Sequence, residues 1–254
     1  MSMINKITLL FLFFLSAITF AQTNKQTEEH YNGWLMYFGS HKLTEKWGLH
    51  LEAQIRRNDY LIHPQQLLLR GGINYHANSN ITLTVGYCFV ETYPYGKLPS
   101  KSTFPEDRIW EQVQIKTPLK KCEWISRFRL EQRFVKNPIY KDDTYKPGSA
   151  VYTNRFRLLN RFSIPLNNST IEDKTIYISA YDELFINFGK NVALNIFDQN
   201  RAYLAIGYKI PIIGRLEIGY LNQLIVKANG IQIENNHTVQ VGISSTIDFK
   251  KAKN

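Results

Sequence analysis

Cysteine is almost absent from this sequence. Among its 254 residues only Cys88 and Cys122 occur, and two cysteines do not make a disulfide framework in a chain of this length. In the strand assignment given below they face opposite sides of a sheet, so we predict free thiols, with a disulfide as the alternative. No His or Cys pair has the spacing of metal ligands, and Asp142 with Asp143 falls short of a Ca²⁺ ligand set. We therefore predict no metal and no cofactor.

Long apolar runs are also lacking, except at the N-terminus. Lys6 gives a positive start, residues 7–20 are apolar, and small residues precede Gln22. These features predict a secretory signal peptide over residues 1–21. The alternative, a membrane anchor, needs about 20 apolar residues, and this run is shorter.

Helical spacing of apolar residues is nearly absent, and a period of two replaces it. Around residue 50, apolar side chains at odd-numbered positions alternate with polar ones such as His50 and Glu52. Eleven segments follow this pattern, near residues 33–42, 46–57, 64–77, 80–92, 106–117, 121–136, 150–165, 174–188, 196–210, 215–226 and 236–249. Alternation is typical of strands with one apolar and one polar face. We predict an all-β domain over residues 33–249, an N-terminal segment at 22–32 that could be part of the first strand, and a basic tail at 250–254.

Six positions break the alternation. On the polar face stand Leu68, Leu159 and Leu221, and on the apolar face stand Gln132, Asn160 and Asp182. Strand bulges or strand ends would explain such exceptions.

Two architectures fit these strands. In a water-soluble sandwich or lipocalin-like barrel the apolar face is interior, whereas in a membrane barrel it meets lipid and the polar face lines the lumen. The polar face is rich in arginine, whose planar guanidinium suits dense ion pairs in a confined space. Its charged members are Arg56, Arg70, Arg127, Arg129, Arg133, Arg155, Arg157, Arg161 and Arg201, with Glu52, Glu131, Glu183, Glu217 and Asp248. This composition favours the membrane barrel.

Segment length and aromatic placement favour the same architecture. The segments are longer than ordinary globular strands, and a tilted strand needs roughly 9–11 residues to cross a bilayer. Aromatic residues near the ends of apolar runs fit interfacial girdles, although they would also fit a soluble core. They are Trp47, Tyr75, Trp124, Phe134, Tyr208, Tyr220 and Phe249. We predict a transmembrane antiparallel up-and-down β-barrel in the bacterial outer membrane.

The number of strands follows from a rule of parity. Single-chain bacterial barrels have an even number of strands, and their short turns normally face the periplasm. The short connections follow the odd-numbered segments, so the first segment runs towards the periplasm. A strand that runs away from the periplasm should then precede it. Residues 27–35 could hold that strand. We therefore expect about twelve strands, with ten as the alternative.

Several segments together resemble a known family. They are GWLMYFG (33–39), RRNDYL (56–61), PQQLLLR (64–70), VETYPYG (90–96), RIWEQ (108–112), YDELFINFG (181–189), DQNRAYLAIGYK (198–209) and EIGYLNQ (217–223). The combination resembles a domain-of-unknown-function family of predicted outer-membrane β-barrels, common in Bacteroidota. The resemblance implies the fold and the location, and it implies no activity and no site residues.

No catalytic motif is recognisable. The lipase-type G-x-S-x-G does not occur, and GISST at residues 242–246 does not match it. Outer-membrane lipid hydrolases place Ser and His on the outer wall, and Ser126 has outward parity, but this sequence supports no triad. We predict no catalytic residues and interpret the histidines as lumen or loop residues.

Charge on the polar face leads to a hypothesis of function. Nine arginines with Lys116 and Lys209 oppose five acids there, and rings of positive side chains favour anions. The residues expected to line the lumen and contact solutes are Glu52, Arg56, Arg70, Arg127, Arg129, Glu131, Arg133, Arg155, Arg157, Arg161, Glu183 and Arg201. The first hypothesis is a narrow channel or transport barrel that prefers small anions. The alternatives are an outer-membrane lipid-modifying enzyme and a non-conducting structural or adhesive barrel, since twelve strands allow an open or a closed lumen.

Expected partners follow from the loops. Basic side chains on the long connections would meet lipopolysaccharide phosphates and other outer-membrane lipids, namely Lys97, Lys101, Lys136, Lys141 and Lys146. No nucleic acid is expected, because the arginines line one face of strands with no exposed aromatic platform beside them.

Overall fold

Thirteen strands make up the part of the chain that the computed structural model describes, residues 25–97 and 99–249. The expected signal peptide, residues 1–21, and the basic tail, residues 250–254, lie outside the described residues. Within the described ranges, no helix has the length and apolarity needed to cross a membrane.

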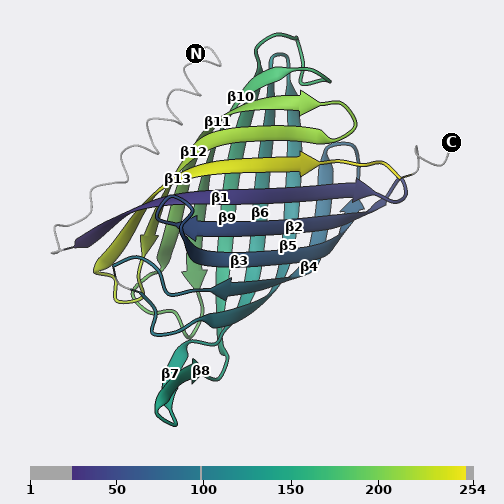
Figure 1. The fold of residues 1–254 in the computed structure, drawn as a ribbon. Helices are drawn as coiled ribbons and strands as arrows, with labels where there is room; N and C mark the ends of the chain where they lie inside the picture. The colour runs from purple at the N-terminus through teal and green to yellow at the C-terminus, as the bar shows by residue number, and fades with distance from the viewer. Residues whose placement is uncertain (1–24, 98, 250–254) are drawn as a thin grey trace, which may run out of the picture.

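Eleven of the strands form a closed barrel, and two form a separate hairpin. The strands are β1 (Gln26–Lys42), β2 (Trp47–Asn58), β3 (His63–His76), β4 (Ile81–Thr92), β5 (Phe104–Leu119), β6 (Cys122–Val135), β7 (Pro138–Lys141), β8 (Thr144–Pro147), β9 (Val151–Pro165), β10 (Ile176–Phe188), β11 (Phe197–Ile210), β12 (Gly214–Val226) and β13 (Gln232–Ser245). Around the barrel the order is β1-β13-β12-β11-β10-β9-β6-β5-β4-β3-β2 (Figure 1). The all-β barrel architecture predicted from the alternation is confirmed.

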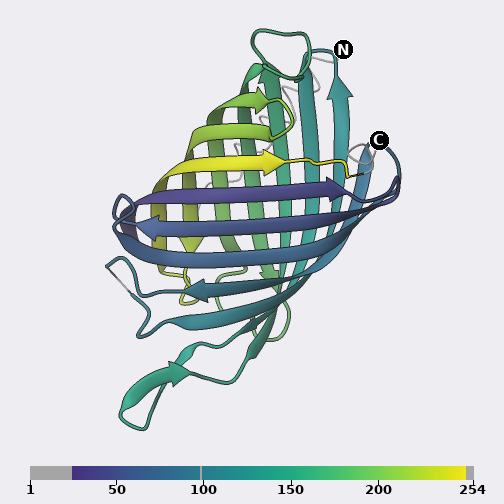
Figure 2. The same cartoon turned by 45° about the vertical axis from the view of Figure 1, so that its right-hand side comes forward.

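Hairpin β7–β8 projects beyond the barrel from the connection between β6 and β9 (Figure 2). Asp142 and Asp143 form its two-residue turn, and both have positive φ angles, 51° and 56°. Such a turn matches the twist of a two-residue hairpin and tolerates Asp at both positions. The turn geometry therefore explains why two Asp residues stand side by side at positions 142 and 143.

The strand count differs from the even number expected. Residues 27–35 do not form a separate upward strand, because they belong to β1, which is one strand of 17 residues. β1 pairs with β13 in parallel, from Gln26 opposite Gln232 to Gly39 opposite Ser245, while every other neighbouring pair in the barrel is antiparallel. Each hairpin reverses the chain, so the first and last of eleven strands run the same way. One parallel seam therefore closes an odd barrel.

The barrel has two distinct ends. We call the end formed by connections 59–62, 93–103, 136–150, 189–196 and 227–231 the loop end. The opposite end, formed by connections 43–46, 77–80, 120–121, 166–175 and 211–213, is the turn end. β1 starts at the loop end and β13 finishes at the turn end, so the two ends of the barrel chain lie at opposite ends of the barrel (Figure 1).

Burial along each strand is the reverse of that in a water-soluble barrel. In β2 the apolar side chains of Trp47 and Ile55 are each 50% exposed, while Glu52 and Arg56 are only 5% and 7% exposed. Successive side chains of a strand point to opposite faces, so the apolar row covers the outside and the polar row fills the inside. The same pattern recurs in β11, where Leu204 is exposed and Arg201 is buried.

The three leucines on the polar face are not explained by bulges. Strand register is continuous at Leu68, Leu159 and Leu221, and all three are buried inside the barrel. Two of them belong to small apolar clusters within the lumen. One cluster contains Leu68, Cys88, Val90 and Trp110, and the other contains Trp34, Met36, Tyr203, Ala205 and Leu221. The exceptions therefore mark places where the lumen is packed with apolar side chains.

Glycines beside Trp110 let its ring lie against the barrel wall. A Cβ on Gly86 would meet Gly71 O at 2.1 Å and the Trp110 ring at 2.9 Å, whereas a Cβ on Gly71 would have nothing within 4 Å. We expect Gly86→Ala to lower the free energy of unfolding by about 1–3 kcal/mol through overpacking. The measurement is urea unfolding in detergent micelles. Gly71→Ala is the matched control, and an equal loss in both variants would contradict the packing explanation.

Candidate functional site

The site is the interior of the barrel, which the pleat of the strands fills with charge. The structure places on the inner face all twelve residues expected to line the lumen, which are Glu52, Arg56, Arg70, Arg127, Arg129, Glu131, Arg133, Arg155, Arg157, Arg161, Glu183 and Arg201. They come from β2, β3, β6, β9, β10 and β11. Most are buried, and Arg127, Arg133 and Arg161 are half-buried.

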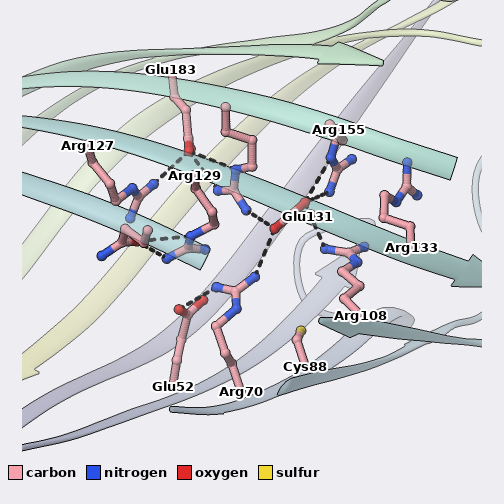
Figure 3. A network of polar contacts seen from close by, with 12 residues as sticks. Glu52, Arg70, Cys88, Arg108, Arg127, Arg129, Glu131, Arg133, Arg155 and Glu183 are labelled. Carbon is pink, nitrogen blue, oxygen red and sulfur yellow. Dashed lines mark hydrogen bonds and ion pairs between the residues drawn. The ribbon is translucent and has the colours of Figure 1, made fainter. Parts of the chain in front are cut away.

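Glu131 on β6 is the centre of a network of ion pairs, and its side chain is fully buried. One carboxylate oxygen lies 2.6 Å from Arg155 Nη2, and the other lies 2.7 Å from Arg157 Nη1. Arg70 and Arg108 approach the same carboxylate at 3.4 Å and 3.9 Å. Figure 3 shows the guanidiniums of Arg70, Arg108 and Arg155 converging on Glu131. Four cations from three strands, β3, β5 and β9, thus share one carboxylate.

Glu183 and Glu52 extend the network to either side. Glu183 Oε1 accepts from Arg127 Nη2 at 2.6 Å and from Arg157 Nη2 at 2.7 Å. Glu52 Oε2 accepts from Arg70 Nη1 at 2.5 Å. Because Arg157 and Arg70 each also reach Glu131, the three acids are linked into one network. Every carboxylate in it is shared, which satisfies charges that would be costly to bury alone.

Two arginines inside the barrel, Arg108 and Arg215, are not among the residues expected from the sequence to line the lumen. Arg108 donates to Glu106 at 2.6 Å and 2.9 Å, and Arg133 donates to the same carboxylate. At the turn end, Arg215 donates to Glu123 at 2.6 Å. Arg108 has the same parity as Gln112 in β5, and Arg215 has the same parity as Glu217 in β12. The alternation along each strand therefore assigns both arginines to the polar face.

Asp248, which the alternation assigned to the polar face, does not lie in a barrel strand. β13 ends at Ser245, and Asp248 forms an isolated bridge with Lys42 at the turn end. Asp198, at the start of β11, joins the network around Glu131, because its carboxylate accepts from Arg155 Nη1 at 2.8 Å and Arg155 also pairs with Glu131.

Aromatic rings fill the remaining space at mid-height. The guanidinium carbon of Arg129 lies 4.7 Å from the centroid of Trp110, and that of Arg157 lies 4.4 Å from the centroid of Phe185. Trp110 and Phe185 are fully buried, and Arg129 is 1% exposed. These side chains expose almost no surface to water, so we interpret the middle of the lumen as closed.

Above this closed layer the lumen opens towards the loop end as a cavity of about 410 Å³, which we call the vestibule. Its cationic lining residues are Arg56, Arg70, Arg108, Arg133, Arg155, Arg157, Arg201 and Lys227. Only Glu106 and Asp198 supply carboxylates to the same lining. Eight cations and two anions line the vestibule, and four further carboxylates behind the lining pair with some of these cations, namely Glu52, Glu131, Glu183 and Glu234. The cations remain in excess, so the vestibule is electropositive.

Tyr95, in the connection between β4 and β5, lies at the edge of the vestibule. Its hydroxyl donates to Glu234 Oε2 at 2.9 Å. Burial, together with the Glu234 carboxylate, raises the pKa of Tyr95 well above its usual value. Tyr95 therefore stays a neutral hydrogen-bond donor, and it holds the loop against β13.

The outer wall carries polar contacts of its own. Ser126, which has outward parity, donates its hydroxyl to Asn160 at 2.8 Å. The ring of His237 lies 2.6 Å from the hydroxyl of Tyr220 and 2.7 Å from Glu29 Oε2. In residues 25–97 and 99–249, these contacts bring no serine to a histidine on the outer wall.

Metal-ligating groups are not assembled in the described ranges, where no cluster of three or more His, Cys, Asp or Glu could hold an ion. Cys88 is buried inside the barrel and Cys122 stands at the start of β6, and both are free thiols, as predicted.

Comparison with known proteins identifies a family and no activity. A family model described as "Protein of unknown function (DUF2490)" matches residues 31–242. An uncharacterized protein of Methylorubrum extorquens is 28% identical over 195 residues, which cover 72% of this chain and 75% of that protein. No solved structure matches the chain. The interior has to be interpreted from its own geometry.

Proposed function

Because the chain belongs to the DUF2490 family, whose description assigns no activity, we propose a function from the geometry of the barrel: an outer-membrane barrel that admits small anions and passes them through a gated lumen. The observation that carries the proposal is the charge of the vestibule, where eight cationic side chains face two carboxylates. Positive side chains that line a narrow aqueous space attract anions and repel cations.

A membrane location is supported by the outer wall. Its apolar side chains, such as Leu51, Ile55 and Val239, are 44% to 56% exposed, and a surface of this kind needs a covering that is not water. Of the aromatic residues expected in girdles, Trp47, Tyr208 and Tyr220 are exposed on this wall, whereas Phe249 lies beyond the end of β13. In this orientation the loop end faces outward, since short turns normally face the periplasm.

Lipopolysaccharide is the proposed lipid partner at the loop end. Lys97, Lys136 and Lys146 lie there on the long connections. Each pairs with a nearby carboxylate, at 3.2 Å, 3.3 Å and 3.1 Å respectively. Exposed pairs of this kind are weak, so they leave these lysines available to lipid phosphates.

The closed layer at mid-height determines how the barrel conducts. Passage from the vestibule to the turn end requires the network around Glu131 to rearrange, because Glu131 and the four arginines that approach it are only 0% to 5% exposed. The barrel is therefore a gated pathway with low conductance at rest, unlike a water-filled porin.

Purified protein in a planar lipid bilayer tests this function. Under a KCl gradient we expect small, infrequent conductance steps whose reversal potential shows anion preference. Neutralising the mouth of the vestibule with Arg133→Gln and Lys227→Gln should lower the preference for chloride over potassium. Lys120→Gln, at the exposed turn end, is the control and should leave the reversal potential unchanged.

Two results would overturn the proposal. One is cation preference, or no change of selectivity in the neutralised variant. The other is recovery of the protein in the soluble periplasmic fraction without a shift in gel mobility on boiling, because the arginine face would then meet water.

A further inference from the structure

Two arginines share one tryptophan in the lining of the vestibule. The guanidinium carbon of Arg56 lies 4.2 Å from the centroid of the Trp34 ring, and that of Arg201 lies 5.4 Å from it. The indole is held in place because Trp34 Nε1 donates to Gln65 Oε1 at 2.9 Å. Trp34 is 1% exposed and the two arginines are each 7% exposed. Two buried cations are thus held on one fixed ring.

These two cations lack the carboxylates that neutralise the other arginines of the vestibule. Arg70, Arg108, Arg133, Arg155 and Arg157 each form an ion pair at 3.4 Å or closer. Arg56 instead donates to neutral amides, to Gln54 Oε1 at 3.0 Å and to Gln66 Oε1 at 2.6 Å.

Arg201 is only slightly better compensated. Its nearest carboxylate is that of Glu183 at 3.9 Å, and Glu183 already accepts from Arg127 and Arg157. Arg201 Nη2 donates to Gln199 at 3.2 Å, and its buried Nε has no hydrogen-bond partner. A buried charge with so little compensation is unfavourable. An anion in the vestibule would supply the counter-ion that Arg56 and Arg201 lack.

We propose that Arg56 and Arg201 form a subsite for an oxyanion, either a carboxylate or a phosphate group. The planar guanidinium offers paired N–H donors that match the oxygens of both groups. The vestibule of about 410 Å³ limits the ligand to a small solute. This inference rests on one part of the proposed function, namely that solutes reach the vestibule from the loop end. It does not require that they pass through the barrel.

Calorimetric titration of the full chain in a zwitterionic detergent tests the subsite without any need for conduction. The probes are inorganic phosphate and succinate, each in a constant chloride background, and the two titrations distinguish the two oxyanion classes. We expect saturable binding of at least one probe. Arg56→Gln and Arg201→Gln should each weaken it about tenfold or more, the loss expected when a charge-assisted hydrogen bond is removed.

Two further variants keep the test decisive. Gln66→Glu would place a carboxylate where an amide now accepts from Arg56, and it should abolish binding while both arginines remain. Arg215→Gln, at the turn end where Arg215 pairs with Glu123, is the matched control and should bind as the wild type does. Folding of each variant is checked by its gel mobility before and after boiling.

The outcomes separate the subsite from the proposed function. Absence of saturable binding of either probe, or equal affinity in Arg56→Gln, Gln66→Glu and wild type, overturns the subsite. Binding that depends on Arg56 and Arg201 supports it even if no anion conductance is measured, a result that would overturn only the transport function.

Discussion

Replacement of Glu131 by alanine is expected to lower the free energy of unfolding by about 3–5 kcal/mol, because it leaves buried cations without their counter-ion. Glu131 is the shared acceptor of Arg155 and Arg157 and the nearest common carboxylate of Arg70 and Arg108. Removal of one partner of a buried pair costs more than removal of a surface pair, since the remaining charges cannot reach water. Tryptophan fluorescence during urea unfolding in micelles measures the loss.

Two companion variants identify the cause. Glu131→Gln keeps the volume and removes the charge, so it should destabilise in the same direction as the alanine variant. Glu111→Ala removes a carboxylate from the outer wall, where it accepts only from Gln132 at 3.1 Å, and should change stability by no more than about 0.5 kcal/mol. If Glu131→Ala and Glu111→Ala proved equally stable, the network would not hold the lumen together. If Glu131→Gln were as stable as wild type, packing rather than charge would be responsible.

The second large effect concerns the ends of the chain. An epitope tag placed immediately before Gln26 and another after Asn254 are expected on opposite sides of the membrane, because β1 and β13 run in parallel. In intact cells an antibody should reach the first tag and not the second. A tag in the turn of hairpin β7–β8, between Asp142 and Asp143, marks the loop end as a positive control.

This labelling distinguishes an odd from an even number of barrel strands. An even number of strands would place both tags on one side of the membrane, so equal accessibility of the two would contradict the parallel seam. Permeabilised cells should expose both tags, which confirms that each epitope is intact.

Both effects depend on features that sequence periodicity does not contain. Strand parity correctly separates Glu52 from Leu51 and Arg157 from Leu158, because side-chain direction follows from two successive residues of a pleated chain. It does not reveal that Glu131 meets Arg70, since those residues are 61 positions apart and meet only across the lumen. Strand parity also does not distinguish the two kinds of arginine in the lumen. Arg155 pairs with two carboxylates, whereas Arg56 donates to the side-chain amides of Gln54 and Gln66.

The number of strands shows the same division. Eleven alternating segments are countable in the sequence, and eleven strands form the barrel. The even-number rule led to a twelfth strand within residues 27–35, yet that segment lengthens β1 along β13. Barrel closure depends on which edge strands pair once the sheet has curved. That pairing is a property of the whole sheet and not of any one segment.

The strands, their two faces and the many arginines of the inner face are predictable from the sequence, because they follow from local backbone geometry and residue type. Three features emerge only in the folded barrel: β1 and β13 pair in parallel, Glu131 binds several arginines at once, and Arg56 and Arg201 line the vestibule without close carboxylate partners. Those outcomes depend on distances between residues far apart in the chain, which strand register and barrel curvature establish together.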